Sequence, residues 1–156
     1  MSDANAGGQT MRAAGLFGLH DIRIIDVPSP GSPGPGEVLV RVAAVGICGS
    51  DHHYYNKGAI GGAIVDEGMI IGHEFAGWIG EVGPGVIGLE VGQLVAVEPA
   101  IPCGTCEHCL QGHPNICPEV LFCGSPNHVG AMAEAIVMPA ANGFPLPDGL
   151  TPVEGA

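Results

Sequence analysis

The sequence predicts a mainly β domain with few short helices, and three observations support this fold class. The chain has 27 glycines and 14 prolines among 156 residues, which indicates many turns. Its apolar fraction is 46% and its charged fraction 13%, so a wholly disordered chain is excluded. Short β-branched runs recur between these turns, and no long amphipathic helix interrupts them. The length allows one domain with a hydrophobic core, of a barrel-like or sandwich-like kind.

The elements follow one another as short strands separated by loops. Residues 1–10 are small and polar, and we expect a flexible tail there. Ser29–Gly36 is expected to be a loop, because proline lacks the backbone donor and glycine favours turns. Ala43–Cys48 is less regular than the β-branched run before it. The expected strands are Met11–Phe17, Ile22–Val27, Glu37–Val42, Met69–Ile71, Phe75–Val82 and Leu94–Val97.

The last residues of the chain carry a helix start signal. Thr151 is a capping residue, Pro152 occupies the first helical position, and Glu154 stands three residues after the cap. A helix of about five residues is far too short to be stable alone in water. We therefore expect the chain to have been cut from a longer one, and the alternative is a frayed tail that merely resembles a cap.

The charge and the apolar pattern narrow the classes of partner. Four basic and sixteen acidic residues give a formal net charge of −12. This argues against nucleic acid and anionic membranes, because both require clustered Lys and Arg. No uncharged apolar run reaches the roughly 18 residues of a membrane helix, and the start of the chain does not resemble a signal peptide. We expect a cytoplasmic protein, in which cysteines are more often metal ligands or reactive thiols than disulfides.

The strongest local signal is a run of four cysteines, Cys103-x2-Cys106-x2-Cys109-x7-Cys117. Four thiolates on a loop rich in glycine and proline can surround one tetrahedral Zn²⁺, and such a zinc is structural because no position remains for a substrate. The alternatives are a pair of disulfides or a redox-active Cys-x-x-Cys. His108 and His113 lie inside the same loop and are interpreted as bystanders.

A second group of metal-binding residue types is spread over the first half of the chain. Cys48 closes a β-like run and begins the segment CGSDHHYY, and Gly72-His73-Glu74 follows some twenty residues later. Taken alone, this pattern fits a buried cysteine and a solvated histidine equally well.

Three segments together resemble the zinc-containing medium-chain alcohol dehydrogenases, and within them the sorbitol (polyol) dehydrogenase branch. The segments are VGICGSDHHYY, IIGHEFAGWIGEVGPGV and VGQLVAVEPAIPCGTCEHCLQGHPNIC, and the resemblance extends from about Met11 to Ala156. It implies a GroES-like, β-barrel-type catalytic domain over residues 11–156, with a structural zinc lobe at residues 99–121. In the family, a Rossmann domain that binds NAD(P) follows.

The resemblance also implies roles for individual residues. Cys48 and His73 would bind a catalytic zinc, with Glu74 as a ligand or near-ligand. Ser50 would pass the substrate proton onward, and His53 would be the next group on that path. The lobe cysteines Cys103, Cys106, Cys109 and Cys117 would hold the structural zinc, and the walls of the substrate pocket would include Tyr54 and Phe122.

The implied function is an NAD(P)-dependent oxidation of a secondary alcohol or polyol to a ketone, with two zinc ions per chain and a homo-oligomeric full-length enzyme. The partner is a small-molecule alcohol, with neither nucleic acid nor membrane involved. No G-x-G-x-x-G turn links a strand to a helix, so we expect the nucleotide-binding domain to be absent here and the chain alone to be inactive. The alternative is a stand-alone zinc-stabilised binding or assembly module without catalysis.

Overall fold

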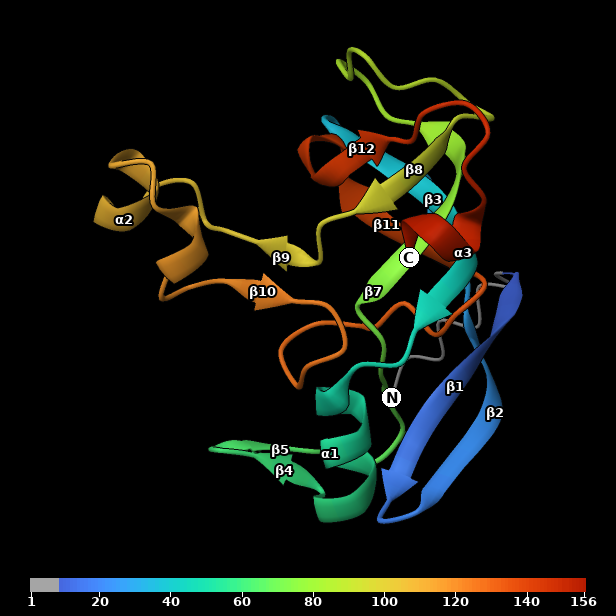
Figure 1. Ribbon diagram of the computed structural model, residues 1–156, viewed down its shortest axis with the longest axis vertical. Helices are drawn as coiled ribbons and strands as arrows, with labels where there is room; N and C mark the ends of the chain where they lie inside the picture. The colour runs from blue at the N-terminus through green and yellow to red at the C-terminus, as the bar shows by residue number, and fades with distance from the viewer. Residues whose placement is uncertain (1–8) are drawn as a thin grey trace, which may run out of the picture.

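A five-stranded antiparallel sheet forms the centre of the computed structural model, which describes residues 9–156 (Figure 1). Each strand pairs with its neighbour in an antiparallel register. In order across the sheet, the strands are β11 (Ala135–Pro139), β3 (Glu37–Gly46), β7 (Glu74–Val82), β8 (Leu94–Val97) and β12 (Gly143–Pro145).

A three-stranded sheet and two short strand pairs complete the β structure. The second sheet has β1 at its centre and lies below the first in Figure 1. Its strands, in order, are β2 (Asp21–Pro28), β1 (Thr10–Gly18) and β6 (Met69–Ile70). The short pairs are β4 (Ala59–Ile60) with β5 (Ala63–Ile64), and β9 (Ala100–Ile101) with β10 (Leu121–Phe122).

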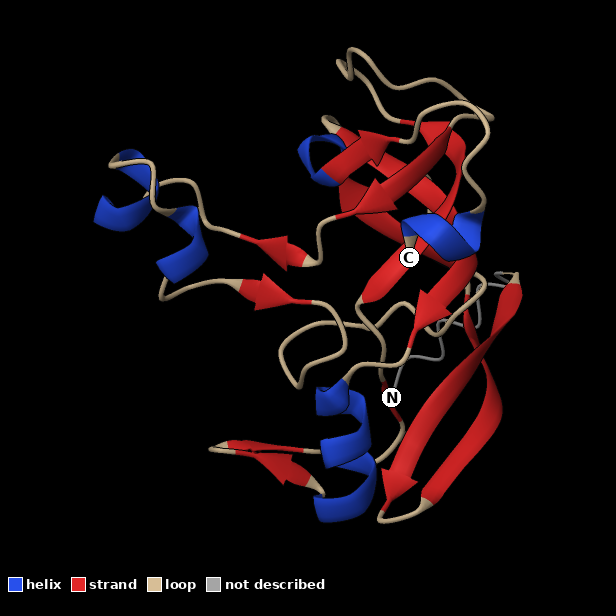
Figure 2. Ribbon diagram, viewed as in Figure 1, coloured by secondary structure: helices blue, strands red, loops and turns tan. Residues whose placement is uncertain are grey.

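Helices are few and short beside the strands (Figure 2). The longest is α1 (Gly49–Lys57), which ends at Gly58 in the left-handed conformation that favours glycine. The others are α2 (Glu107–Leu110), α3 (Pro152–Gly155) and the 3-10 turns η1 (Pro114–Ile116) and η2 (Ala140–Asn142). A mainly β fold with few short helices is therefore confirmed.

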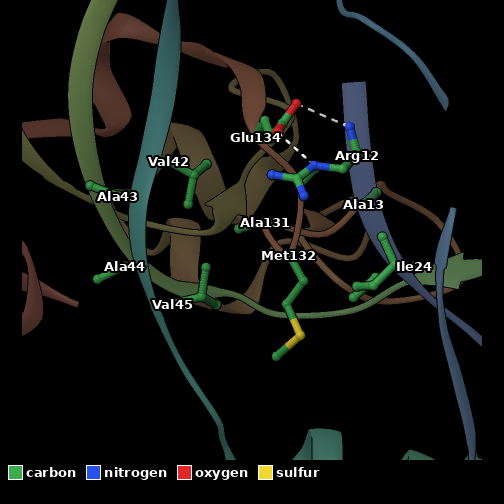
Figure 3. A pocket seen from close by; sticks show the side chains of 12 residues that line it. Arg12, Ala13, Ile24, Val42, Ala43, Ala44, Val45, Ala131, Met132 and Glu134 are labelled. Carbon is green, nitrogen blue, oxygen red and sulfur yellow. Dashed lines mark hydrogen bonds and ion pairs between the residues drawn. The ribbon is translucent and has the colours of Figure 1, made fainter. Parts of the chain in front are cut away.

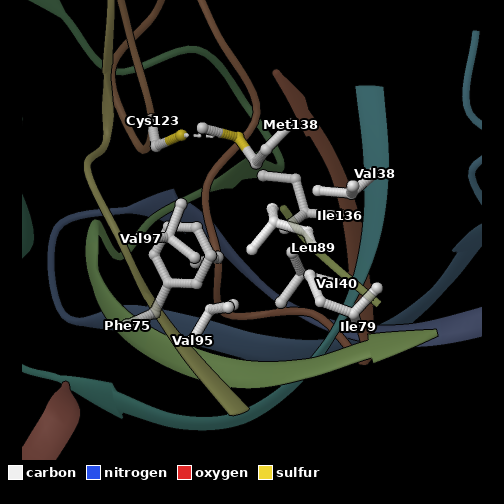
Figure 4. Packing of buried hydrophobic residues seen from close by; sticks show 11 residues of the cluster. Val38, Val40, Phe75, Ile79, Leu89, Val95, Val97, Cys123, Ile136 and Met138 are labelled. Carbon is white, nitrogen blue, oxygen red and sulfur yellow. Dashed lines mark hydrogen bonds between the residues drawn. The ribbon is translucent and has the colours of Figure 1, made fainter. Parts of the chain in front are cut away.

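The main hydrophobic core packs against the five-stranded sheet (Figure 4). Side chains alternate between the two faces of a strand, so every second residue of β8, of β11 and of the first half of β3 is buried here. The buried members are Val38, Val40, Phe75, Ile79, Leu89, Val95, Val97, Cys123, Ala131, Ile136 and Met138.

A second, smaller core joins the three-stranded sheet to α1. It contains Leu16 from β1, Tyr54 from α1, Met69 from β6 and Ile71. Only His73 and its two neighbours separate Ile71 from Phe75 of the main core. The segment that carries His73 is thus anchored by a buried apolar side chain on each side.

All six expected strands form, with small shifts at their ends. β1 begins at Thr10, because Thr10 pairs with Pro28 of β2. The prediction of a flexible tail over residues 1–10 is therefore wrong at Thr10, and its residues 1–8 lie outside the described part of the chain. β3 continues through the segment expected to be irregular, because Ala44, Val45 and Gly46 pair with β7 after a shift in register.

Several elements were not anticipated, among them α1, β11 and β12, and one expectation at the end of the chain is confirmed. Helix α1 is polar and lacks the apolar periodicity that predicts helices. Strands β11 and β12 contain only five and three residues. At the C-terminal end, the Thr151 side chain accepts the Glu154 N–H and the Glu154 carboxylate accepts the Thr151 N–H over 2.8 Å, so the capping box forms.

The strand pairing does not close into a ring within residues 9–156, where β11 and β12 stay at opposite edges of the five-stranded sheet. The barrel-type arrangement is thus an open one in the part of the chain that the structure describes. Over the same residues, no helix has the length and apolar character needed to cross a bilayer.

Candidate metal centres

Four cysteines converge in the segment between β9 and β10. This segment projects from the body of the molecule as a lobe (Figure 1). The Sγ atoms of Cys106 and Cys109 are 3.5 Å apart, those of Cys106 and Cys117 3.9 Å, and those of Cys103 and Cys109 4.0 Å. A tetrahedral zinc with bonds of about 2.3 Å separates its thiolates by about 3.8 Å. The lobe therefore has the dimensions of a four-thiolate zinc site. These separations are far longer than the roughly 2 Å of a disulfide, and all six cysteines are free.

Hydrogen-bond donors around the lobe favour the charged form of one thiol. The Cys106 N–H points at the Cys103 Sγ over 3.3 Å, and the Cys103 N–H points at the Cys117 Sγ over 3.4 Å. Backbone hydrogen bonds from Thr105 and Cys106 lower the pKa of the Cys103 thiol to about 6. Burial and the neighbouring Cys106 thiol raise the pKa of Cys109 to about 12. Metal binding must displace the remaining thiol protons, so the metal affinity of this lobe falls with decreasing pH.

A second centre brings together residues that are distant in the sequence. Cys48 stands immediately before α1, His73 immediately before β7, and Glu74 is the first residue of β7. One ligand atom from each of the three lies within 4.8 Å of the others. Thiolate, imidazole and carboxylate are the donors that zinc takes in proteins, and three protein ligands leave a fourth position open. The donor set thus fits a catalytic rather than a structural zinc.

Asp51 links the two halves of this centre, and the sequence analysis assigned it no role. Its carboxylate is buried, with 2% of the residue exposed. One oxygen accepts the Cys48 N–H over 3.0 Å, and the other accepts the Gly72 N–H over 3.2 Å. That second oxygen also lies 3.8 Å from His73 Nδ1. An acidic residue three positions after a helix cap is a known sequence signal, and it could have identified Asp51.

The remaining predicted site residues differ in how close they lie to His73. The Ser50 Oγ is 3.4 Å from His73 Nε2, and the Phe122 ring lies 5.2 Å from the His73 ring. His53 is exposed on α1. Tyr54 is buried in the smaller core, and this burial raises the pKa of its hydroxyl. The structure thus groups Ser50 and Phe122 around His73, whereas Tyr54 packs in the smaller core.

Similarity to known proteins extends over most of the chain. The family model of the alcohol dehydrogenase GroES-like domain matches residues 34–148. Sorbitol dehydrogenase of Bacillus subtilis is 45% identical over 148 residues, which cover 95% of this chain and 42% of that protein. D-xylulose reductase A of Aspergillus niger is 41% identical over 156 residues, which cover the whole of this chain and 43% of that protein.

A solved structure shares the fold. The crystal structure described as a short chain alcohol dehydrogenase from E. coli, complexed with the cofactor NADH, superposes with a TM-score of 0.80 at 36% identity. The match covers 93% of this chain and 41% of that one. The chain therefore spans less than half the length of the proteins that it matches.

Proposed function

Because the chain belongs to the alcohol dehydrogenase GroES-like domain family, we propose that it is the zinc-binding catalytic part of an NAD(P)-dependent dehydrogenase. The reaction proposed is oxidation of a secondary alcohol, most simply a polyol, to a ketone. The observation that carries this proposal is the convergence of Cys48, His73 and Glu74 beside the Ser50 hydroxyl. The names of the relatives, a sorbitol dehydrogenase and a xylulose reductase, support a polyol as the substrate class.

Cys48, His73 and Glu74 would hold the catalytic zinc, and the four lobe cysteines would hold a structural one. Zinc in the first site would supply Lewis acidity that makes an alcohol hydroxyl more acidic. Ser50 is the hydroxyl beside Nε2 of His73, so it is the group proposed to accept the substrate proton. His53 is exposed on the same helix and would pass that proton to solvent. Phe122 lies against His73 and would exclude water from one side of the site.

The hydride acceptor is proposed to be NAD or NADP, in line with the NADH bound to the E. coli structure. We assign the binding of NAD or NADP to a domain that does not include residues 1–156. Gly83–Gly88 has the G-x-G-x-x-G spacing, but it leads from β7 into a loop rather than into a helix. Phosphate binding by this motif depends on the helix N-terminus that follows it. The chain alone is therefore proposed to be inactive.

A chimera tests the proposal directly. The matching 148-residue segment of B. subtilis sorbitol dehydrogenase is replaced by this chain, and sorbitol- and xylitol-dependent formation of NADH is measured. We expect turnover, and we expect none from the Cys48→Ala chimera, which keeps the four-cysteine lobe. A folded chimera that binds zinc and NADH but oxidises no polyol or simple secondary alcohol would contradict the proposal and favour a non-catalytic module.

A further inference from the structure

The backbone that presents His73 is held by a segment some sixty residues later in the chain. The Ala131 N–H donates to the Gly72 carbonyl over 2.8 Å, and the Met132 N–H donates to the Ile71 carbonyl over 2.9 Å. The Gly72 N–H donates to Asp51. Both backbone groups of the residue before His73 are therefore engaged, and the position of the imidazole depends on these contacts.

The close approach of the two segments requires glycine at two positions. A Cβ at Gly130 would overlap the carbonyl oxygens of Ile70 and Ile71. A Cβ at Gly124 would lie 2.8 Å from the Gly72 nitrogen and 2.9 Å from the Gly72 oxygen. Neither neighbour is a flexible side chain, so an added methyl group has to move the backbone that carries His73.

The far end of the segment is fixed to two other strands. Figure 3 shows Ala131, Met132 and Glu134 between the strand of Arg12 and Ala13 and the strand of Val42–Val45. The Ala14 N–H donates to Met132, the Glu134 N–H donates to Arg12, and the Val42 N–H donates to Glu134. Because this end is held by β1 and β3, strain introduced at Gly130 is directed toward Ile70–His73.

We propose that residues 124–132 form a backbone clamp for the metal ligand His73, with Gly130 and Gly124 as its positioning residues. The clamp acts through Gly72 and contains none of the three proposed metal ligands. The inference rests on the proposed function only in taking His73 as a metal ligand. Changes in the contacts that orient metal ligands typically weaken metal binding about 10- to 100-fold.

The test uses Gly130→Ala and Gly124→Ala in the whole chain, with Co²⁺ as a spectroscopic probe and zinc content as a second readout. We expect both variants to bind metal at the Cys48–His73–Glu74 centre about 10- to 100-fold more weakly. Binding at the four-cysteine lobe should be unchanged. The Cys48→Ala and Cys103→Ala variants assign the cobalt absorption of each centre, because each removes one thiolate.

Gly83→Ala is the matched control, since its Cβ would overlap the Gly34 carbonyl, and Gly83 follows the end of β7 opposite to His73. It should lower stability without changing the cobalt spectrum of either centre. Gly31→Ala, where the Cβ meets open space, should change neither property. Equal loss of metal at both centres, or the same spectral change in Gly83→Ala, would overturn the proposal.

Two variants and the chimera distinguish a failure to fold from a failure of the proposed function. If Gly130→Ala does not fold, Gly124→Ala decides, because its Cβ contacts are longer. Gly124 has a φ of +70°, so it is compared with Gly36→Ala, where φ is +77° and the Cβ meets open space. Loss of the fold in both variants would contradict the clamp, since the glycines would then serve the core in general. If the wild-type chain binds two metals and the chimera above has no activity, the proposed function fails while the clamp is still testable by the same spectra.

Discussion

At the scale of single residues, the proposed metal centre depends on a buried carboxylate that accepts hydrogen bonds with both oxygens. Asp51 accepts hydrogen bonds from the N–H groups of Cys48 and Gly72. Cys48 is itself one of the candidate ligands, and Gly72 directly precedes another, His73. Hydrogen bonds to charged groups are stronger than those between neutral groups. Asp51 thereby fixes the separation between the Cys48 backbone and the residue next to His73.

We therefore expect Asp51→Asn to weaken both metal binding and the fold. An amide replaces one acceptor oxygen with an NH₂ group, which would face a backbone N–H in a buried position. The free energy of unfolding should fall by about 1–3 kcal/mol, and the metal affinity of the Cys48–His73–Glu74 centre should fall about 10- to 100-fold. Urea unfolding and metal titration measure the two effects. Asp148→Asn, at an exposed position, should show neither, and an unchanged affinity in Asp51→Asn would remove Asp51 from the site.

His128 gives the protein a defined pH dependence. Its Nε2 atom is buried without a hydrogen-bond partner among residues 9–156, and burial lowers the pKa of the ring. The unfolded chain, with an ordinary histidine pKa of about 6.5, then takes up a proton more readily than the folded one. Stability should therefore be lost as the pH falls below about 6.5. Urea unfolding at several pH values should show a shallower loss for His128→Asn, and identical slopes would exclude this cause.

The two groups of candidate metal-binding residues could be proposed from the sequence because they follow from the spacing and the donor types of its Cys, His and Glu residues. The prediction of the four-cysteine lobe depends only on the spacing of its cysteines. The prediction of the second centre depends on the resemblance to a family. Asp51, Gly124 and Gly130 act through backbone contacts with distant segments. Sequence periodicity carries no information about such contacts, so these residues emerge only from the folded chain.

At the scale of elements, strands were predicted better than helices because the strands bury apolar side chains in alternation. Helix α1 lies between the ligand Cys48 and the smaller core, and its only buried residues are Asp51 and Tyr54. The helix is stabilised at its two ends, by the capping hydrogen bond to Asp51 at its start and by the left-handed conformation of Gly58 at its end. A polar helix of this kind does not show the apolar pattern on which helix prediction depends.

The four-cysteine lobe should lose its structure independently of the sheets when metal is removed. Neither α2 nor η1 contains a buried residue, so the lobe has little apolar contact to replace the metal bonds. After treatment with a chelator, amide exchange should become fast over residues 103–117 and stay slow at Val38 and Val40. Hydrogen-exchange mass spectrometry measures both regions at once. Unchanged protection of the lobe would show that the metal does not stabilise it.

At the scale of the whole molecule, the proposed metal centre lies between two hydrophobic cores. The main core contains Phe75 and the smaller one contains Ile71, with His73 between them in the chain. Cys48 likewise joins β3 of the main sheet to α1, which packs in the smaller core. A metal bound by Cys48 and His73 would therefore connect the two cores, and binding should stabilise the folded chain as a whole.

Leu16→Ala tests this connection between the smaller core and the metal centre. Leu16 is fully buried beside Ile71, and truncation of a buried leucine typically costs about 2–5 kcal/mol. We expect that loss in urea unfolding of the metal-free chain, together with weaker metal binding at the Cys48–His73–Glu74 centre. Ile87→Ala, at a side chain that is 95% exposed, should change neither quantity. If Leu16→Ala reduced stability but left metal affinity at its wild-type value, the smaller core would support the fold without positioning the metal ligands.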